Sequence, residues 1–163
     1  MIIKQLYKNL NLESGDVATL FLHGVLPVFL GGLIYIIWRS TSLLMFSWFD
    51  GFGLTSHINV LRNISFAVPE WVIYSLPSGL WIYSFSFILI YIWHDAKSKS
   101  KYLWMSLAPI IALGSELGQL IGVIPGTFDL ADIALYMVFI GLSTLAVWML
   151  RQKNSMRRVN NER

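Results

Sequence analysis

Residues 71–93, WVIYSLPSGLWIYSFSFILIYIW, form a mostly apolar run that contains no charged side chain. The hydrocarbon core of a bilayer is about 30 Å thick, and about 20 helical residues cross it. Trp71 and Trp93 stand at the two ends of the run, where aromatic side chains anchor a helix in the membrane interfaces. We therefore predict a membrane-spanning helix over residues 71–93.

Three further stretches of the same kind predict spans over about residues 20–38, 102–121 and 130–150. Only 13% of the 163 residues are charged and 56% are hydrophobic, whereas about 25% of the residues of a soluble domain are charged. This composition excludes a soluble enzyme and a nucleic-acid-binding module. We predict an all-α integral membrane protein, residues 1–163 forming a single domain built as a bundle of four transmembrane helices.

The segment between the first two predicted spans, residues 40–69, is apolar but interrupted by Asp50, Gly51, Gly53 and His57. It can be an interfacial or re-entrant outer segment, or a fifth span. The positive-inside rule slightly favours four spans, because all Lys and Arg residues except Arg39 and Arg62 then lie in the cytoplasm. Both models place residues 94–101 and the basic tail 151–163 inside, so the turn between the last two spans faces outward.

Three glycines, Gly114, Gly118 and Gly122, repeat at every fourth residue of the third predicted span. This is the small-xxx-small pattern that lets two membrane helices approach closely. We expect the glycine face to pack the third helix against a neighbour, with the fourth helix as the first candidate.

Acidic and amide side chains gather near the outward turn. Glu116 and Gln119 share one face of the third helix, and Asp129 and Asp132 lie in the first turns of the fourth. An ionisable group inside a membrane is costly and is a functional candidate by default. The spacing predicts that these four residues converge on one outward-facing pocket, with Gln119 as the first partner of Glu116.

The only outward cations of the four-span model, Arg39 and Arg62, can neutralise this pocket or hold a phosphate. Structural explanations stay open beside the functional one. Glu116 can be a polar clamp between helices, and helix capping accounts for Asp129 by itself.

The chain contains no cysteine and none of the HExxH, GxSxG, Walker or dinucleotide-binding motifs. The sequence therefore predicts no metal site and names no cofactor. Clustered carboxylates can act as an acid or base, hold a divalent cation, or bind an amino or hydroxyl ligand. His23 is interpreted as a hydrogen-bonding residue in helix packing, and His94–Asp95 as solvated interface.

The pattern Glu116-x-x-Gln119 followed by Pro125-Gly126-Thr127-Phe128-Asp129-x-x-Asp132 resembles the signature of the VanZ-like membrane proteins. In that family an arginine usually follows the turn glycine, where Thr127 stands here, and an asparagine usually occupies the position of Tyr136. The resemblance implies a small multi-spanning protein of the bacterial cytoplasmic (inner) membrane. It also implies a link to low-level resistance to glycopeptide antibiotics such as teicoplanin.

Three functions follow as hypotheses. The first is a protein whose outward carboxylate pocket engages a cell-envelope precursor or a lipid headgroup. The second is a membrane enzyme acting on a lipid-linked phosphate, and the third is an accessory subunit that docks a larger membrane partner. The expected partners are membrane lipid, a lipid-linked envelope precursor or a membrane protein, and not nucleic acid.

Overall fold

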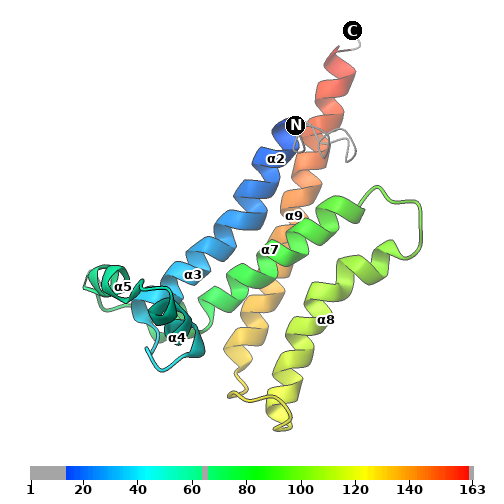
Figure 1. The fold of residues 1–163 in the computed structure, drawn as a ribbon. Helices are drawn as coiled ribbons and strands as arrows, with labels where there is room; N and C mark the ends of the chain where they lie inside the picture. Colours follow the sequence, from blue (N-terminus) through cyan, green and yellow to red (C-terminus); the bar gives the residue numbers. More distant parts are fainter. Residues whose placement is uncertain (1–13, 64–65, 162–163) are drawn as a thin grey trace.

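The computed structural model describes residues 14–63 and 66–161, and over these residues every regular element is a helix (Figure 1). The apolar face that the sequence places on Ile2, Ile3, Leu6 and Leu10 lies outside the described residues. In chain order the elements are α2 (Ser14–Leu20), the π-helical turn η1 (Phe21–Val25), α3 (Leu26–Trp38), α4 (Leu44–Gly51), α5 (Thr55–Arg62), α6 (Glu70–Tyr74), α7 (Leu76–Trp93), α8 (Lys101–Leu120) and α9 (Leu130–Asn161).

Among the described residues, four helical stretches are long and apolar enough to cross a membrane. They cover Gly15–Trp38, Leu76–Trp93, Lys101–Leu120 and Leu130–Lys153. The predicted all-α architecture with four spans is therefore confirmed. The first span begins earlier than predicted, and the last helix continues as far as Asn161, so most of the predicted tail extends α9.

The second predicted span, residues 71–93, is interrupted and forms two helices, α6 and α7, that meet at Ser75. Pro77 has no backbone N–H, so it cannot bond to the carbonyl of Ile73 one turn earlier. Pro27 has a related effect in the first span. Just before it, the N–H of Leu26 donates to the carbonyl of Phe21, five residues back, in a π-helical turn.

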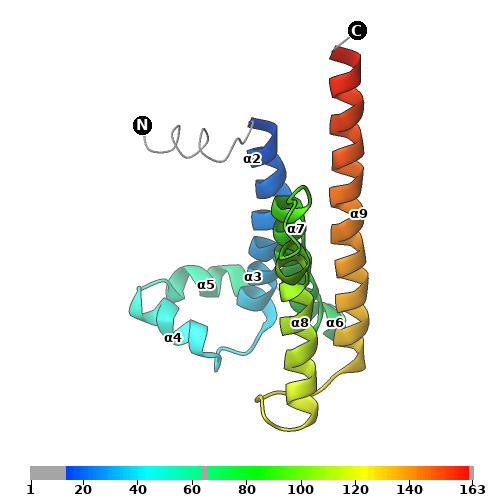
Figure 2. The ribbon, with the colours of Figure 1, turned by 90° about the vertical axis from the view of Figure 1, so that its right-hand side faces the viewer.

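The segment between the first two spans forms the α4–α5 hairpin, whose turn contains Gly53 at a φ of 69°. Each of its helices has eight residues, about 12 Å at 1.5 Å per residue, which is far too short to cross a bilayer. The alternative of a fifth span is therefore wrong. Figure 2 shows the hairpin projecting sideways from the end of α3, across the direction of the spans.

Helix α7 is the centre of the bundle and packs against α3, α8 and α9 (Figure 1). It is the most buried of the four spans. Its side chains Phe87, Ile90 and Tyr91 form a core cluster with Val147 of α9. Small residues let the neighbours approach: a Cβ on Gly79 would lie 2.6 Å from ring atoms of Phe139 in α9.

The predicted glycine face of the third span does not form a helix-packing seam. A Cβ on Gly114 would meet nothing within 4 Å, and Gly122 lies beyond the end of α8 with a φ of 72°. A Cβ on Gly118 would meet the side chain of Ile124, in the turn that follows its own helix. The prediction is wrong because α8 packs mainly on α7 through another face, while α7 takes the central position.

The two ends of the bundle differ in character. We call the end with the α8–α9 turn and the α4–α5 hairpin the turn end, and the end with residues 94–100 and the C-terminal part of α9 the basic end (Figure 1). At the basic end the Arg151 guanidinium pairs with Asp95 at 2.7 Å and donates to the carbonyl of Tyr91 at 2.7 Å. The Tyr91 hydroxyl in turn donates to Asp16 of α2. These contacts join the first, second and last spans.

The predicted solvated interface at His94–Asp95 is exposed, yet it also carries this helix–helix contact. A hydrogen bond with His94, together with the charge of Arg151, lowers the pKa of Asp95 below its ordinary value of 3.8.

Candidate functional site

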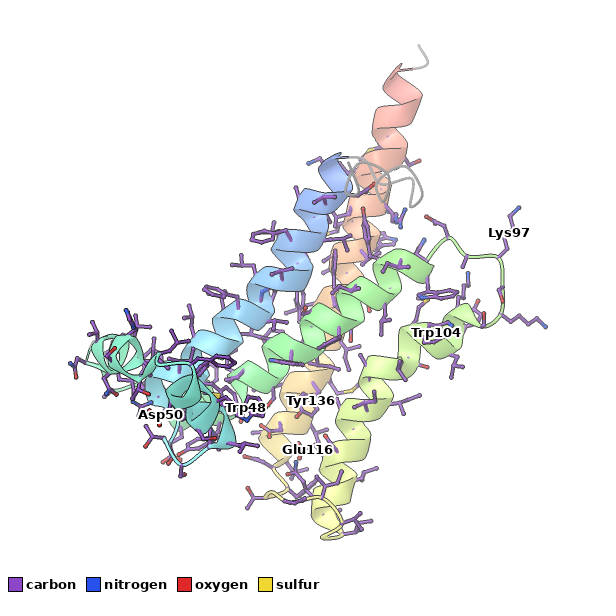
Figure 3. All side chains as sticks on the ribbon, viewed as in Figure 1. Trp48, Asp50, Lys97, Trp104, Glu116 and Tyr136 are labelled. Atoms are coloured by element: carbon purple, nitrogen blue, oxygen red, sulfur yellow. The ribbon has the colours of Figure 1, made fainter. Side chains whose placement is uncertain are left out.

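Glu116 of α8 is the most deeply buried ionisable side chain near the turn end, with 1% of its surface exposed. The hydroxyl of Tyr136 on α9 donates a hydrogen bond to its Oε1 across 3.2 Å. The second oxygen, Oε2, is buried and has no hydrogen-bond partner. Figure 3 shows Glu116 and Tyr136 beside each other between the lower parts of α8 and α9. One carboxylate oxygen of Glu116 is thus hydrogen bonded to α9, and the other lacks a hydrogen bond.

Asp132 lies one helical turn before Tyr136 on the same face of α9. Its Oδ1 is also buried without a hydrogen-bond partner. Ser78 of α7 and Tyr136 line one cavity. We call Glu116, Asp132, Tyr136 and Ser78 the acid–tyrosine cluster. It offers two unused carboxylate oxygens around one tyrosine.

The other two acidic-motif residues have local structural roles. The side chain of Gln119 packs on Gly126, whose φ of 143° and lack of a Cβ make room for it. The partner of Glu116 is therefore Tyr136, and the predicted Glu116–Gln119 pairing is wrong. Asp129 is exposed and accepts a hydrogen bond from the N–H of Ala131 at 2.8 Å, which caps the start of α9.

Arg39 and Arg62 do not join the acid–tyrosine cluster. Arg62 donates to the carbonyls of Ile36 and Arg39 at 2.8 and 2.9 Å, so it caps the C-terminal end of α3 from α5. The Arg39 guanidinium lies over the rings of Tyr35 and Tyr74, at 5.1 and 4.7 Å from their centroids. The prediction that these arginines neutralise the carboxylates is wrong, because each has other contacts.

A cavity of about 920 Å³ opens beside the cluster, between α3, α7 and α8, with contributions from α4 and α9. Tyr136 forms part of its wall, so the residue that binds Glu116 also faces the cavity. The lining is chiefly apolar and consists of Gly32, Tyr35, Met45, Pro77, Ser78, Trp81, Ile82, Phe85, Leu89, Leu107, Ala108, Ile111, Ala112 and Tyr136.

Polar and apolar groups are separated along the length of this cavity. Its three hydroxyls come from Tyr35, Ser78 and Tyr136, which lie toward the turn end of their helices. Deeper in the bundle the wall is made by residues such as Phe85, Leu89 and Leu107. From Pro77 to Leu89 the wall extends about 18 Å along α7, at 1.5 Å per residue. The cavity is therefore long, polar at one end and apolar at the other.

Glu116 does not line this cavity, but it lies on α8 beyond the polar end and behind Tyr136, which forms part of the wall. Ala108 and Ala112 line the cavity from α8, and Glu116 continues the same helix face one turn nearer the turn end. The unsatisfied oxygens of Glu116 and Asp132 are acceptors, so the chemistry that suits them is a hydroxyl, amide or ammonium donor. Within the described ranges, no three His, Asp or Glu side chains come together as metal ligands would.

His23 belongs to a different part of the bundle. Its Nδ1 is hydrogen bonded to the hydroxyl of Tyr83 at 2.6 Å, and its ring stacks on Phe87 with centroids 4.5 Å apart. The prediction that it is a hydrogen-bonding residue in helix packing is confirmed. It links the first span to α7.

Sequence reasoning brought Glu116 and Asp132 together but missed Tyr136 as the residue between them. The signal was present, because Tyr136 follows Asp132 by four residues and so shares its helix face. The participation of Ser78 and the existence of the cavity depend on how α7 crosses α8 and α9, and no local pattern shows that.

Comparisons with known proteins leave the site to be interpreted from its own geometry. No family model matches the chain, and no curated protein or solved structure is similar to it.

Proposed function

We propose that this chain is a bacterial cytoplasmic-membrane protein that binds an amphiphile, a lipid or a lipid-linked envelope precursor, in the cavity between α3, α7 and α8. The apolar chain of the ligand lies along α7 and α8, and its polar head lies at the turn end. A hydroxyl, amide or ammonium group of the head donates hydrogen bonds to Glu116 and Asp132.

The observation that carries this proposal is the pair of buried carboxylate oxygens without partners, Glu116 Oε2 and Asp132 Oδ1. A buried polar group that lacks a hydrogen bond costs about 1–3 kcal/mol, and a charged one costs more. Two such atoms around Tyr136, which itself lines the cavity, favour a ligand that satisfies them.

The order of groups along the cavity supports an amphiphile over a compact polar ligand. Hydroxyls gather at one end, and about 12 Å of apolar wall follows along α7 from Trp81 to Leu89, at 1.5 Å per residue, which suits a hydrocarbon chain. Ligand sites are typically apolar cavities with a few convergent polar groups, and volumes of 300–1,000 Å³ are common.

The proposed orientation places the turn end outside and the basic end in the cytoplasm. Lys97, Lys99 and Lys101 lie at the basic end, as does the C-terminal part of α9, and positive residues are concentrated on the cytoplasmic side of membrane proteins (Figure 3). The polar end of the cavity then faces the cell envelope. The resemblance to the VanZ-like signature agrees with this location and extends the proposal to glycopeptide resistance.

The contacts of the outer arginines weigh against a phosphoryl-transfer enzyme. Such chemistry relies on several cations around the transferred phosphoryl group. Arg62 is used at the end of α3, which leaves Arg39, over the rings of Tyr35 and Tyr74, as a single cation and not the several that such chemistry needs. Binding without chemical transformation is therefore the function that the geometry supports best.

The test measures binding of three probes with 12-carbon chains, dodecylamine, dodecanol and methyl laurate, to the protein in lipid nanodiscs. Dodecylamine and dodecanol present donors, whereas methyl laurate presents only acceptors. We expect the wild type to bind the two donor probes about tenfold more tightly, which corresponds to about 1.4 kcal/mol. Glu116→Gln and Asp132→Asn should reduce this preference to less than threefold.

Matched controls separate the site from a general effect of charge removal. Glu70→Gln and Asp129→Asn remove exposed carboxylates, and asparagine still caps a helix, so both should keep the wild-type preference. Ala112→Phe fills the cavity and should lower the affinity for all three probes. Ala134→Phe, on an exposed face of α9, should leave these affinities unchanged. Equal binding by the Ala112→Phe variant and the wild type would refute the cavity as the site.

A further inference from the structure

The Arg39 side chain is a cation with no hydrogen-bond acceptor among the described residues. It is half-buried at the end of α3, where it lies over the rings of Tyr35 and Tyr74. Among the residues that the structure describes, no carboxylate or carbonyl accepts a hydrogen bond from its guanidinium. The two cation–π contacts hold the guanidinium beside the rings but use none of its N–H groups.

Two other arginines of the described segments have guanidinium groups whose N–H donors bond to acceptors within the protein. Arg62 bonds two backbone carbonyls, and Arg151 bonds Asp95 and the carbonyl of Tyr91. Arg39 has aromatic contacts only. Its donors are therefore available for a ligand, and its position is fixed before a ligand arrives.

Arg39 does not line the cavity itself, but its contact with Tyr35 places it beside the polar end. Tyr35, whose ring it covers, is part of the cavity wall, and its hydroxyl is one of the three that mark the polar end. The acid–tyrosine cluster contributes to the same end from α8 and α9 through Tyr136. A ligand head at this end thus meets acceptors on one side and a stacked guanidinium on the other.

Building on the proposed amphiphile site, we propose that Arg39 binds a phosphate group on the head of the ligand. A planar guanidinium can donate two parallel hydrogen bonds to phosphate oxygens, and such charge-assisted bonds are among the stronger ones in proteins. The rings of Tyr35 and Tyr74 hold the Arg39 guanidinium at this position. The ligand class is therefore a phosphate-bearing amphiphile whose head also contains a hydrogen-bond donor.

Two sources share this chemistry: a phospholipid, with a phosphate diester, and an isoprenoid-linked precursor, with a terminal phosphate. The experiment measures binding of farnesyl phosphate, lysophosphatidylglycerol, farnesol and inorganic phosphate to the full-length protein in nanodiscs of neutral lipid. We expect both phosphate amphiphiles to bind at least tenfold more tightly than farnesol. Inorganic phosphate alone should bind much more weakly, because it lacks the chain. The tighter of the two amphiphiles identifies the source.

Variants of Arg39 test the assignment. Arg39→Gln should lower the affinity for farnesyl phosphate at least tenfold and change farnesol binding less than twofold, whereas Arg39→Lys should keep part of the phosphate preference. Lys97→Gln removes a positive charge at the basic end, and it should change neither the affinity for farnesyl phosphate nor that for farnesol. Equal phosphate preference in Arg39→Gln and the wild type would overturn the assignment to Arg39.

The two proposals fail in distinguishable ways. If Ala112→Phe leaves farnesol and farnesyl phosphate binding unchanged, the cavity itself is not the site. If Ala112→Phe abolishes binding of both but Arg39→Gln keeps the phosphate preference, the cavity stands and the phosphate assignment is wrong.

Discussion

The Tyr136 hydroxyl donates a hydrogen bond to Oε1 of Glu116 across 3.2 Å and so joins α9 to α8. These two helices make fewer contacts with each other than either makes with α7. This polar contact between two buried side chains therefore supplements the few contacts between the last two spans, where Tyr136 shares a core cluster with Ala108.

Replacing Tyr136 by phenylalanine should destabilise the protein by about 1–3 kcal/mol. The change leaves the ring in place but removes the only hydrogen bond that the described residues make to the Glu116 carboxylate. The measurement is the free energy of unfolding in mixed micelles of detergent and sodium dodecyl sulfate.

Tyr102→Phe is the matched control, because Tyr102 is 66% exposed and its hydroxyl can be solvated. It should unfold like the wild type. If Tyr136→Phe and Tyr102→Phe unfold alike, the Tyr136–Glu116 bond does not stabilise the bundle.

Gly79→Ala should be more destabilising than Gly114→Ala, although both glycines lie inside helices. A Cβ on Gly79 would lie 2.6 Å from two ring atoms of Phe139, whereas a Cβ on Gly114 would meet nothing within 4 Å. We expect a loss of about 1–3 kcal/mol for Gly79→Ala and little change or slight stabilisation for Gly114→Ala.

The same unfolding assay also tests the cause of the Gly79→Ala effect. Adding Phe139→Leu to Gly79→Ala should restore part of the lost stability, because it removes the ring that the new Cβ meets. The opposite ranking of the two single variants would return the helix-packing role to the glycines of α8.

Acid should weaken the contact between Asp95 and Arg151. The pKa of Asp95 is lowered in the folded protein, so its contribution to stability is complete above its ordinary pKa of 3.8 and is lost as the pH falls through the folded pKa. Between pH 7 and pH 3 the melting temperature of the wild type should fall more than that of Asp95→Asn. Glu70→Gln, which keeps the pair, should follow the wild type; a parallel fall in Asp95→Asn would contradict the role of Asp95.

Cysteine labelling tests the orientation in this cysteine-free chain. Thr127→Cys, in the α8–α9 turn, should react with a membrane-impermeant maleimide added to intact spheroplasts, and Lys97→Cys should react only after lysis. Thr127 is preferable to Gly126, because Gly126 has a φ of 143° and a side chain there would meet Gln119. The reverse labelling pattern would invert the proposed orientation.

The spans could be predicted from sequence because their lengths and apolar character are local properties. The interruption at Ser75 could be anticipated from Pro77, whose missing N–H is a property of one residue. The sequence could not decide between a hairpin and a fifth span. That choice depends on Arg62 of α5 folding back to cap α3, which is a contact between residues 26 positions apart.

The candidate site was predictable only where helix periodicity decides it. The i, i+3 and i, i+4 spacings place Glu116 and Asp132 near one turn, and the structure brings Tyr136 between them. Helix packing was not predictable from the glycine spacing alone. Gly79, which seats α9, lies beside Pro77 and forms a small-xxx-small pair with Ser75, not with another glycine.

The two hydrogen bonds from Arg62 to the end of α3 have a mechanical consequence. They fasten the α4–α5 hairpin to the end of the first span, so a swing of the hairpin away from α3 must break both bonds. Met45, which forms part of the cavity wall from α4, travels with the hairpin. For the proposed amphiphile, an entrance beside Met45 therefore opens with less loss of hydrogen bonding by a tilt of the first span, which carries the hairpin with it, than by a swing of the hairpin alone.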